Sequence, residues 1–205
     1  MSRELIFYTN PMSRGQIVRW MLEESGAKYQ QQVVEYGPDM KSEEYLQINP
    51  MGKVPAIKHG DTIVTECSAI CAYLADSFPD AGLAPATENR GEYYRWLFFA
   101  AGPFESGITN NNLGFTTDQE QQRTAGYGTY DLVLSVLDQH LAGRQFVAGD
   151  SFSAADIYVG SQVDFGLQFG SIKETDNFNA YVEGLRSRPK YQLAKQKDMA
   201  LMLDQ

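Results

Sequence analysis

Over the first 78 residues, the order of hydrophobic and polar positions switches repeatedly between strand-like and helix-like patterns. Residues 4–8 are a short apolar run, which is typical of a strand covered on both faces. The next segment places Ile17, Trp20 and Met21 at helical spacing and reaches a stop signal at Gly26. Continued along the chain, the pattern predicts a strand at 4–8, a helix at 13–28, a strand at 29–36, a polar helix at 39–49, two strands within 53–66 joined at His59-Gly60-Asp61, and a helix at 67–78.

After these elements the strand-like pattern disappears. Residues 79–88 are rich in Pro, Gly and Ala and are interpreted as a linker. The remainder, 89–205, places its large apolar side chains at helical spacing. Helix breaks and a helix-capping pair divide this remainder at Gly102-Pro103, at Ser153 with Asp156, and at Pro189. The pattern predicts a small mixed sheet flanked by helices, followed by an all-α domain.

Composition and charge narrow the class of protein. With 43% hydrophobic and 21% charged residues among 205, the chain has the composition of an ordinary globular protein. The formal net charge of −9 disfavours binding to nucleic acid or anionic lipid, and no basic stripe offsets it. No apolar run approaches the roughly 20 residues that a membrane span needs, and no signal-peptide pattern opens the sequence. We therefore expect a cytoplasmic protein that binds neither nucleic acid nor membrane.

The two cysteines, Cys67 and Cys71, lie four residues apart and share one face of the helix predicted there. Their spacing does not suggest a disulfide framework. His59 and His140 stand at no ligand spacing to them. We therefore expect two reduced, buried thiols and no metal site.

One proline stands where a strand is predicted. Pro55, in the stretch NPMGKVPAI, has no N–H group to donate to a neighbouring strand. Five stretches of the chain, in order and at the family's spacing, resemble the soluble glutathione S-transferases, in particular their bacterial or theta-like members. These stretches are FYTNPMSRGQIVRWMLEESG, INPMGKVPAI, TECSAICAYL, AGDSFSAADIYV and YVEGLRSRPKYQLA. Because they span most of the chain, the resemblance is specific although each stretch alone is weak.

The resemblance implies a fold and a role for the proline. It implies an α/β thioredoxin-like N-terminal domain of order βαβ-αββα at 1–78, a linker at 79–88, and an all-α domain at 89–205 that contributes the pocket for an electrophile. It also implies that the Val54–Pro55 bond is cis. In the family this geometry turns the N–H and C=O groups of the preceding residue outward, where they pair with the cysteinyl part of glutathione. Val54 and Pro55 are therefore expected in the binding site.

Glutathione carries two carboxylates and one ammonium, so its site needs anion donors and a carboxylate. Glu66 can accept from the γ-glutamyl ammonium, and the helix that starts behind it presents N–H groups to the γ-glutamyl carboxylate. Where the family usually has Ser, this chain has Cys67, whose thiol is a poor donor, and Ser68 stands one position later. By the resemblance, Lys53 meets the glycyl carboxylate, with Lys41 as a second candidate.

Conjugation needs the glutathione thiolate, and a free thiol has a pKa of about 8.5, so a donor must stabilise the anion. Ser13, at the start of the first helix, is the favoured donor, because bacterial members of the family carry Ser or Cys at about this place. Tyr8 fits the tyrosine-type members of the family. Asn10 and Arg14 are further candidates, and Arg14 adds positive charge to the glutathione site.

These residues predict a glutathione transferase that joins the glutathione thiolate to small hydrophobic electrophiles, working as a homodimer in detoxification. Two alternatives stay open at this point. One is a glutathione-dependent peroxidase or isomerase that uses the same site. The other is a binding or regulatory protein that has kept the fold and lost turnover.

Overall fold

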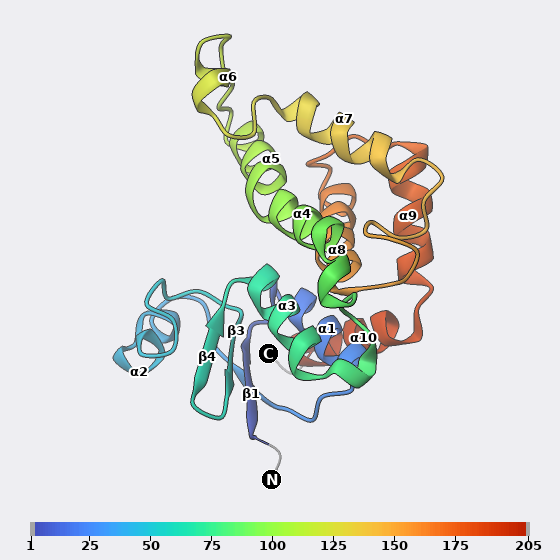
Figure 1. Ribbon diagram of the computed structural model, residues 1–205. Helices are drawn as coiled ribbons and strands as arrows, with labels where there is room; N and C mark the ends of the chain where they lie inside the picture. The colour runs from blue at the N-terminus through green and yellow to red at the C-terminus, as the bar shows by residue number, and fades with distance from the viewer. Residues whose placement is uncertain (1–2, 204–205) are drawn as a thin grey trace. The chain divides into compact units, whose positions relative to one another are not determined.

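The computed structural model describes residues 3–203 (Figure 1). Contacts within the chain divide it into two compact units. The first runs to Leu83 and also takes the chain from Arg188 onward, and the second is Ala84–Ser187. Each unit is described by itself.

The first unit is built on a four-stranded mixed sheet. Its strands are β1 (Leu5–Thr9), β2 (Gln30–Val33), β3 (Ala56–His59) and β4 (Thr62–Thr65). The strand order is β2-β1-β3-β4, with β1 parallel to β2 and β3 antiparallel to both β1 and β4. This arrangement confirms the thioredoxin-like fold, and the hairpin forms at the Gly60-Asp61 turn as predicted.

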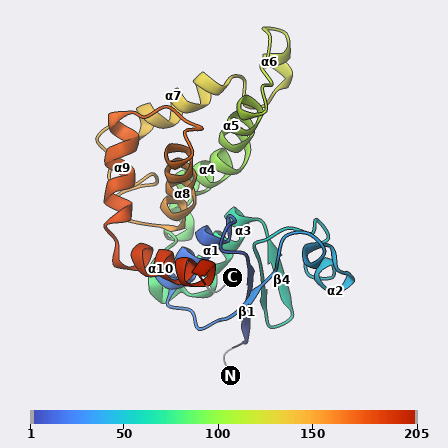
Figure 2. The same ribbon diagram turned by 180° about the vertical axis from the view of Figure 1, so that it is seen from behind.

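Helices cover the two faces of this sheet unequally. On one face lie α1 (Gly15–Ser25), α3 (Cys67–Ser77) and α10 (Pro189–Leu203), while the short α2 (Glu43–Leu46) lies on the other (Figures 1 and 2). Successive side chains of a strand point to opposite faces. In β1, Phe7 therefore packs on the α1 side, under the Arg19 guanidinium, whereas Tyr8 joins the cluster on the α2 side.

The polar helix predicted at 39–49 is wrong in extent. The structure has a 3₁₀ turn, η1 (Asp39–Lys41), and then α2, which is a single helical turn. Ser42 separates them because its backbone is extended (φ −65°, ψ 148°) and its hydroxyl accepts from the N–H of Tyr45 as a helix cap. The preference of Ser for capping thus overrides the helix-forming residues around it.

The second unit is all-α, as predicted. Figure 2 shows α8 flanked by α4 and α9, in agreement with the contacts between these helices. The Gly102-Pro103 interruption is a π-helical turn that joins α4 to α5, and the Ser153–Asp156 capping box opens α8. Its helices are α4 (Gly91–Phe99), α5 (Glu105–Asn112), α6 (Gln121–Thr124), α7 (Tyr130–Leu141), α8 (Ala154–Gln168) and α9 (Asp176–Arg186), with η4 (Ala100–Phe104) between α4 and α5. Short 3₁₀ turns, η2 (Pro79–Ala81) and η3 (Thr87–Asn89), lie in the stretch interpreted as a linker.

The last helix differs from the sequence-based expectation. The chain does restart at Pro189, but α10 packs along α1 and belongs to the first unit, not to the helical domain. The Trp20 and Tyr191 rings meet edge to face at 5.0 Å. Arg19 and Asp198 form a buried ion pair with an Nε–Oδ1 distance of 2.6 Å. These contacts between distant parts of the sequence place α10 in the first unit, although it follows the helical domain in the chain.

Both cysteines are free thiols. Cys71 is fully buried, and that burial raises the pKa of its thiol well above the usual value. Cys67 is only half-buried, which differs from the expectation of two buried thiols. Within residues 3–203, no group of three or more His, Cys, Asp or Glu side chains is arranged to hold a metal ion. Over the same residues, every helix is too short or too polar to cross a membrane.

Candidate functional site

A cavity of about 710 Å³ in the first unit gathers five of the predicted site residues. Three segments form its walls: the turn between β1 and α1, the loop after β2, and the segment that leads into β3. Its lining consists of Ser13, Arg14, Tyr36, Gly37, Pro38, Met40, Lys41, Gly52, Lys53 and Val54. The fold therefore brings Ser13, Arg14, Lys41, Lys53 and Val54 together from positions up to 41 residues apart in the chain, counting from 13 to 54.

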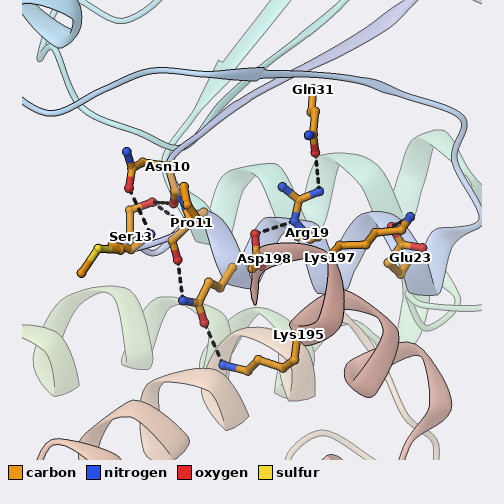
Figure 3. A network of polar contacts seen from close by, with 12 residues as sticks. Asn10, Pro11, Ser13, Arg19, Glu23, Gln31, Lys195, Lys197 and Asp198 are labelled. Carbon is orange, nitrogen blue, oxygen red and sulfur yellow. Dashed lines mark hydrogen bonds and ion pairs between the residues drawn. The ribbon is translucent and has the colours of Figure 1, made fainter. Parts of the chain in front are cut away.

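Asn10 organises the turn that carries Ser13 (Figure 3). Its carbonyl accepts hydrogen bonds from both the backbone N–H (3.1 Å) and the hydroxyl (2.7 Å) of Ser13. The side-chain oxygen of Asn10 accepts from the N–H of Met12 at 3.0 Å, and its amide donates to the carbonyl of Val34 at 3.2 Å. Because the Asn10 side chain is buried and fully used, its role in this structure is to hold the turn.

The Ser13 hydroxyl donates one hydrogen bond and accepts another. Besides donating to Asn10, its oxygen accepts from the N–H of Gly15 at 2.9 Å. It stands just before α1, whose N-terminal end favours negative charge. Gly15 is required there, since a Cβ atom would collide with Thr9 Oγ1 and come within 3.0 Å of Ser13 Oγ.

The Val54–Pro55 bond is cis, as the resemblance implies. Pro55 is buried and immediately precedes β3, while Val54 is half-buried and lines the cavity. Within residues 3–203, no hydrogen bond engages the N–H or the C=O of Val54. Main-chain groups seldom stay unpaired in a partly buried position, so these two groups are available to a ligand with an extended backbone.

The two lysines of the cavity have different surroundings. Lys41 Nζ donates to the carbonyls of Met51 and Gly52, each at 3.0 Å, and so fastens the loop before β3. Gly52 has φ +57°, and a Cβ there would approach the carbonyl of Met40 to 2.5 Å, so only glycine fits this loop. The exposed Lys53 ammonium has no hydrogen bond or ion pair with the described part of the chain, which leaves its charge available.

Glu66, Cys67 and Ser68 start α3 but do not line this cavity. Glu66 has φ +66° and ψ 121°, and among residues 3–203 it is the one non-glycine residue with a positive φ. Backbone strain of this kind is concentrated at functional sites. The Cys67 thiol donates to the carbonyl of Arg14 at 3.7 Å, which joins the start of α3 to the Ser13 turn.

Tyr8 does not belong to the Ser13 cavity. It lies on the α2 side of the sheet, in the lining of a separate cavity of about 500 Å³ that also includes Tyr45 and Lys58. Tyr8 is 7% exposed, and its ring stands 5.8 Å from that of Tyr45. Burial, and then the nearby Glu44 carboxylate, raises the pKa of the Tyr8 phenol.

Sequence reasoning missed the loop after β2. Tyr36, Gly37, Pro38 and Met40 all line the cavity, and the Tyr36 hydroxyl donates to the carbonyl of Met12 at 3.2 Å. The Gly37-Pro38 pair signals a turn at this point of the sequence. That signal does not show on which side of the sheet the loop lies.

Comparisons with known proteins match both halves of the chain. The family described as "Glutathione S-transferase, N-terminal domain" matches residues 3–76, and "Glutathione S-transferase, C-terminal domain" matches residues 95–189. The chain is 27% identical over 199 residues to glutathione S-transferase hmp2 of Hypomyces subiculosus, which covers 88% of this chain and 92% of that protein.

Two further similarities bear on chemistry. The disulfide-bond oxidoreductase YghU of Escherichia coli is 31% identical over 170 residues, which cover 76% of this chain and 58% of YghU. A sphingomonad glutathione S-transferase, solved in complex with glutathione, has a TM-score of 0.75 and 28% identity, and the match covers 94% of this chain and 98% of that one. The similarity therefore extends over both units of the chain.

Proposed function

Because this chain belongs to the glutathione S-transferase family, we propose that its 710 Å³ cavity binds glutathione and that the Ser13 hydroxyl stabilises the glutathione thiolate. The thiolate then attacks a small hydrophobic electrophile. The observation that carries this proposal is the presence, in one cavity, of the Ser13 hydroxyl and the unpaired main-chain groups of Val54.

Each of the three parts of glutathione has a matching group in this chain. The N–H and C=O of Val54 pair with the cysteinyl backbone, and the Lys53 ammonium binds the glycyl carboxylate. At the other end, the Glu66 carboxylate accepts from the γ-glutamyl ammonium. The N-terminal end of α3, at Cys67 and Ser68, favours an anion and binds the γ-glutamyl carboxylate.

The chemical step needs one change at Ser13. The Ser13 hydroxyl rotates so that it donates to the glutathione sulfur in place of the Asn10 carbonyl. A neutral hydrogen bond is thereby replaced by a charge-assisted one. The Gly15 N–H keeps its bond to the Ser13 oxygen and polarises the hydroxyl, while Arg14 and the N-terminal end of α1 add positive potential. The sulfur lone pair forms the new S–C bond, and the leaving group takes the electron pair of the bond that breaks.

A second candidate function is reduction of disulfides at the same site, which the similarity to YghU supports. The same thiolate would attack a disulfide sulfur in place of carbon, forming a mixed disulfide and releasing a thiolate. The cavity lining has a serine and no cysteine, so glutathione itself would supply the attacking sulfur. Conjugation is favoured because this chain resembles proteins named as transferases over more of its length.

We further propose that the protein works in the cytoplasm as a homodimer, in line with the soluble transferases of the family, and that its role is detoxification. Size-exclusion chromatography with light scattering measures the oligomeric state. A monomer at micromolar concentration would contradict this part of the proposal.

Titration calorimetry with glutathione, followed by turnover of an activated aromatic halide, tests the proposed function. We expect saturable binding, turnover, and a large loss of turnover in Ser13→Ala but not in Tyr8→Phe. Absence of heat would leave a shared fold without the shared ligand. Binding without turnover of either the halide or a disulfide would support a non-catalytic binding protein.

A further inference from the structure

The turn that carries Ser13 is connected to the last helix of the chain. Lys195 Nζ, on α10, donates to Gln16 Oε1 at 2.8 Å, and Gln16 Nε2 donates to the carbonyl of Pro11 at 2.6 Å. Figure 3 shows this line of contacts running from Lys195 to Pro11, next to Asn10 and Ser13. Pro11 lies inside the turn, between the residue that organises it and the residue that carries the hydroxyl.

The chemistry of the groups fixes the orientation of the Gln16 amide. A carbonyl can only accept and an ammonium can only donate, so the NH₂ group of Gln16 must face Pro11 and its oxygen must face Lys195. The Lys195 charge polarises the amide and strengthens the bond to Pro11. The arrangement therefore acts as a directional link from α10 to the turn.

α10 is a firm support for this link. The Arg19–Asp198 pair behind it is almost fully buried, with side-chain exposures of 0% and 2%. Near the C-terminal end of α1, Glu24 binds Arg188 at 2.7 Å and Glu23 binds Lys197 at 2.6 Å. Because these contacts hold α10 in place, the side chain of Lys195 can restrain the turn that carries Ser13.

We propose that Gln16, held by Lys195, is a positioning residue for the Ser13 hydroxyl, so that α10 sets the geometry of the catalytic turn. This inference rests on the proposed function. Without the bond from Gln16, the Pro11 carbonyl is free to turn, and the turn that directs the Ser13 hydroxyl widens. A hydrogen bond to a developing anion is sensitive to displacements below 1 Å, so the thiolate is stabilised less well.

Gln16→Glu separates this role from simple packing. A carboxylate keeps, and strengthens, the contact with Lys195 but has no N–H to give to Pro11. We expect kcat to fall by about five- to ten-fold and the apparent pKa of the bound thiol to rise by about half a unit to one unit. The KM for glutathione and the unfolding midpoint should stay close to wild type, because the Val54, Lys53 and Glu66 contacts and the α1–α10 packing are unchanged.

Two further variants provide the controls. Lys195→Gln removes the charge but retains a donor, so we expect an intermediate effect on kcat in the same direction. Lys197, two residues after Lys195 on α10, binds Glu23 near the C-terminal end of α1, away from the Ser13 turn. Lys197→Gln removes this ion pair and should leave kcat and the thiol pKa unchanged. The charged groups nearest the bound sulfur and the Ser13 turn, Arg14, Lys41, Lys53, Glu35 and Glu66, are retained in every variant. Gln16→Glu adds a carboxylate and Lys195→Gln removes an ammonium, so both variants are also titrated at high salt, where the direct effect of these charges on the thiol pKa is screened.

The pH dependence of kcat, measured for wild type, the three variants and Ser13→Ala, decides between the outcomes. A wild-type profile for Gln16→Glu, together with a shifted profile for Ser13→Ala, would overturn the positioning role and leave the proposed function standing. A wild-type profile for Ser13→Ala itself would overturn both. A fall in the unfolding midpoint of Gln16→Glu with unchanged kcat would show that the link is structural only.

Discussion

Ser13 and Tyr8 are five residues apart, yet they line two separate cavities. Ser13 is half-buried among main-chain donors and two lysines. Tyr8 is packed against Tyr45, with a carboxylate nearby that raises the pKa of its phenol further. In the proposed site, the surroundings of a hydroxyl, and not its place near the end of β1, decide whether it can stabilise a thiolate.

Removal of the Ser13 hydroxyl should have the largest effect on activity. A hydrogen bond to a charged group contributes about 1.5–3 kcal/mol, so we expect kcat/KM of Ser13→Ala to fall roughly 10- to 100-fold. Steady-state kinetics with glutathione and an aromatic halide measure this value. A change below two-fold would remove the basis for distinguishing the two cavities.

Gly15→Ala should perturb the Ser13 cavity alone. The new Cβ collides with Thr9 Oγ1, a buried group without a hydrogen-bond partner among the described residues, and overpacking of this kind costs about 1–3 kcal/mol. Chemical denaturation measures the loss, and Thr9→Ala in the same chain should recover part of it. No recovery in the double variant would mean that strain elsewhere is responsible.

The two lysines of the Ser13 cavity should separate binding from stability. We expect Lys53→Met to raise the KM for glutathione about five-fold, since its charge is available for the ligand, with little effect on unfolding. Lys41→Met should lower the free energy of unfolding by about 1 kcal/mol, because the carbonyls of Met51 and Gly52 lose their donor. Calorimetry and denaturation, run on both variants, test the assignment; the opposite pattern would reverse it.

Tyr8→Phe should have the smallest effect. Because the pKa of Tyr8 is raised, the phenol stays protonated throughout the neutral range, and the pH profile of kcat/KM should match that of wild type. The folded state favours the neutral phenol, so the Tyr8 contribution to stability is present below pH 10 and is lost as the pH rises through the raised pKa. Denaturation above pH 10 should therefore show a shallower loss of stability in Tyr8→Phe. A steeper loss would contradict this sign.

Much of the fold was predictable because its signals are local. Apolar runs and helical spacing located the four strands, α1 and α3, and the Ser153–Asp156 pair located the start of α8. The cis bond at Pro55 was implied by the resemblance and is present. Five of the predicted site residues share one cavity because they lie at the ends of elements that the fold brings to one place.

The remaining features depend on long-range packing. The Arg19–Asp198 pair joins residues 179 positions apart, and nothing near either residue indicates that α10 folds back onto α1. Strand alternation places Tyr8 and Phe7 on opposite faces, but only the packed structure shows that α1 covers the Phe7 side. The same holds for Lys41, whose partners are carbonyl groups that the sequence does not distinguish.

The most direct test is the ultraviolet titration of the glutathione thiol bound to wild type, Ser13→Ala and Tyr8→Phe. The thiolate absorbs where the thiol does not, so the titration reports the pKa of the sulfur itself. We predict a pKa well below the free value of about 8.5 in wild type and Tyr8→Phe, and a pKa raised by about one to two units in Ser13→Ala. An unchanged pKa in Ser13→Ala, or a rise confined to Tyr8→Phe, would contradict the assignment of the thiolate to the Ser13 cavity.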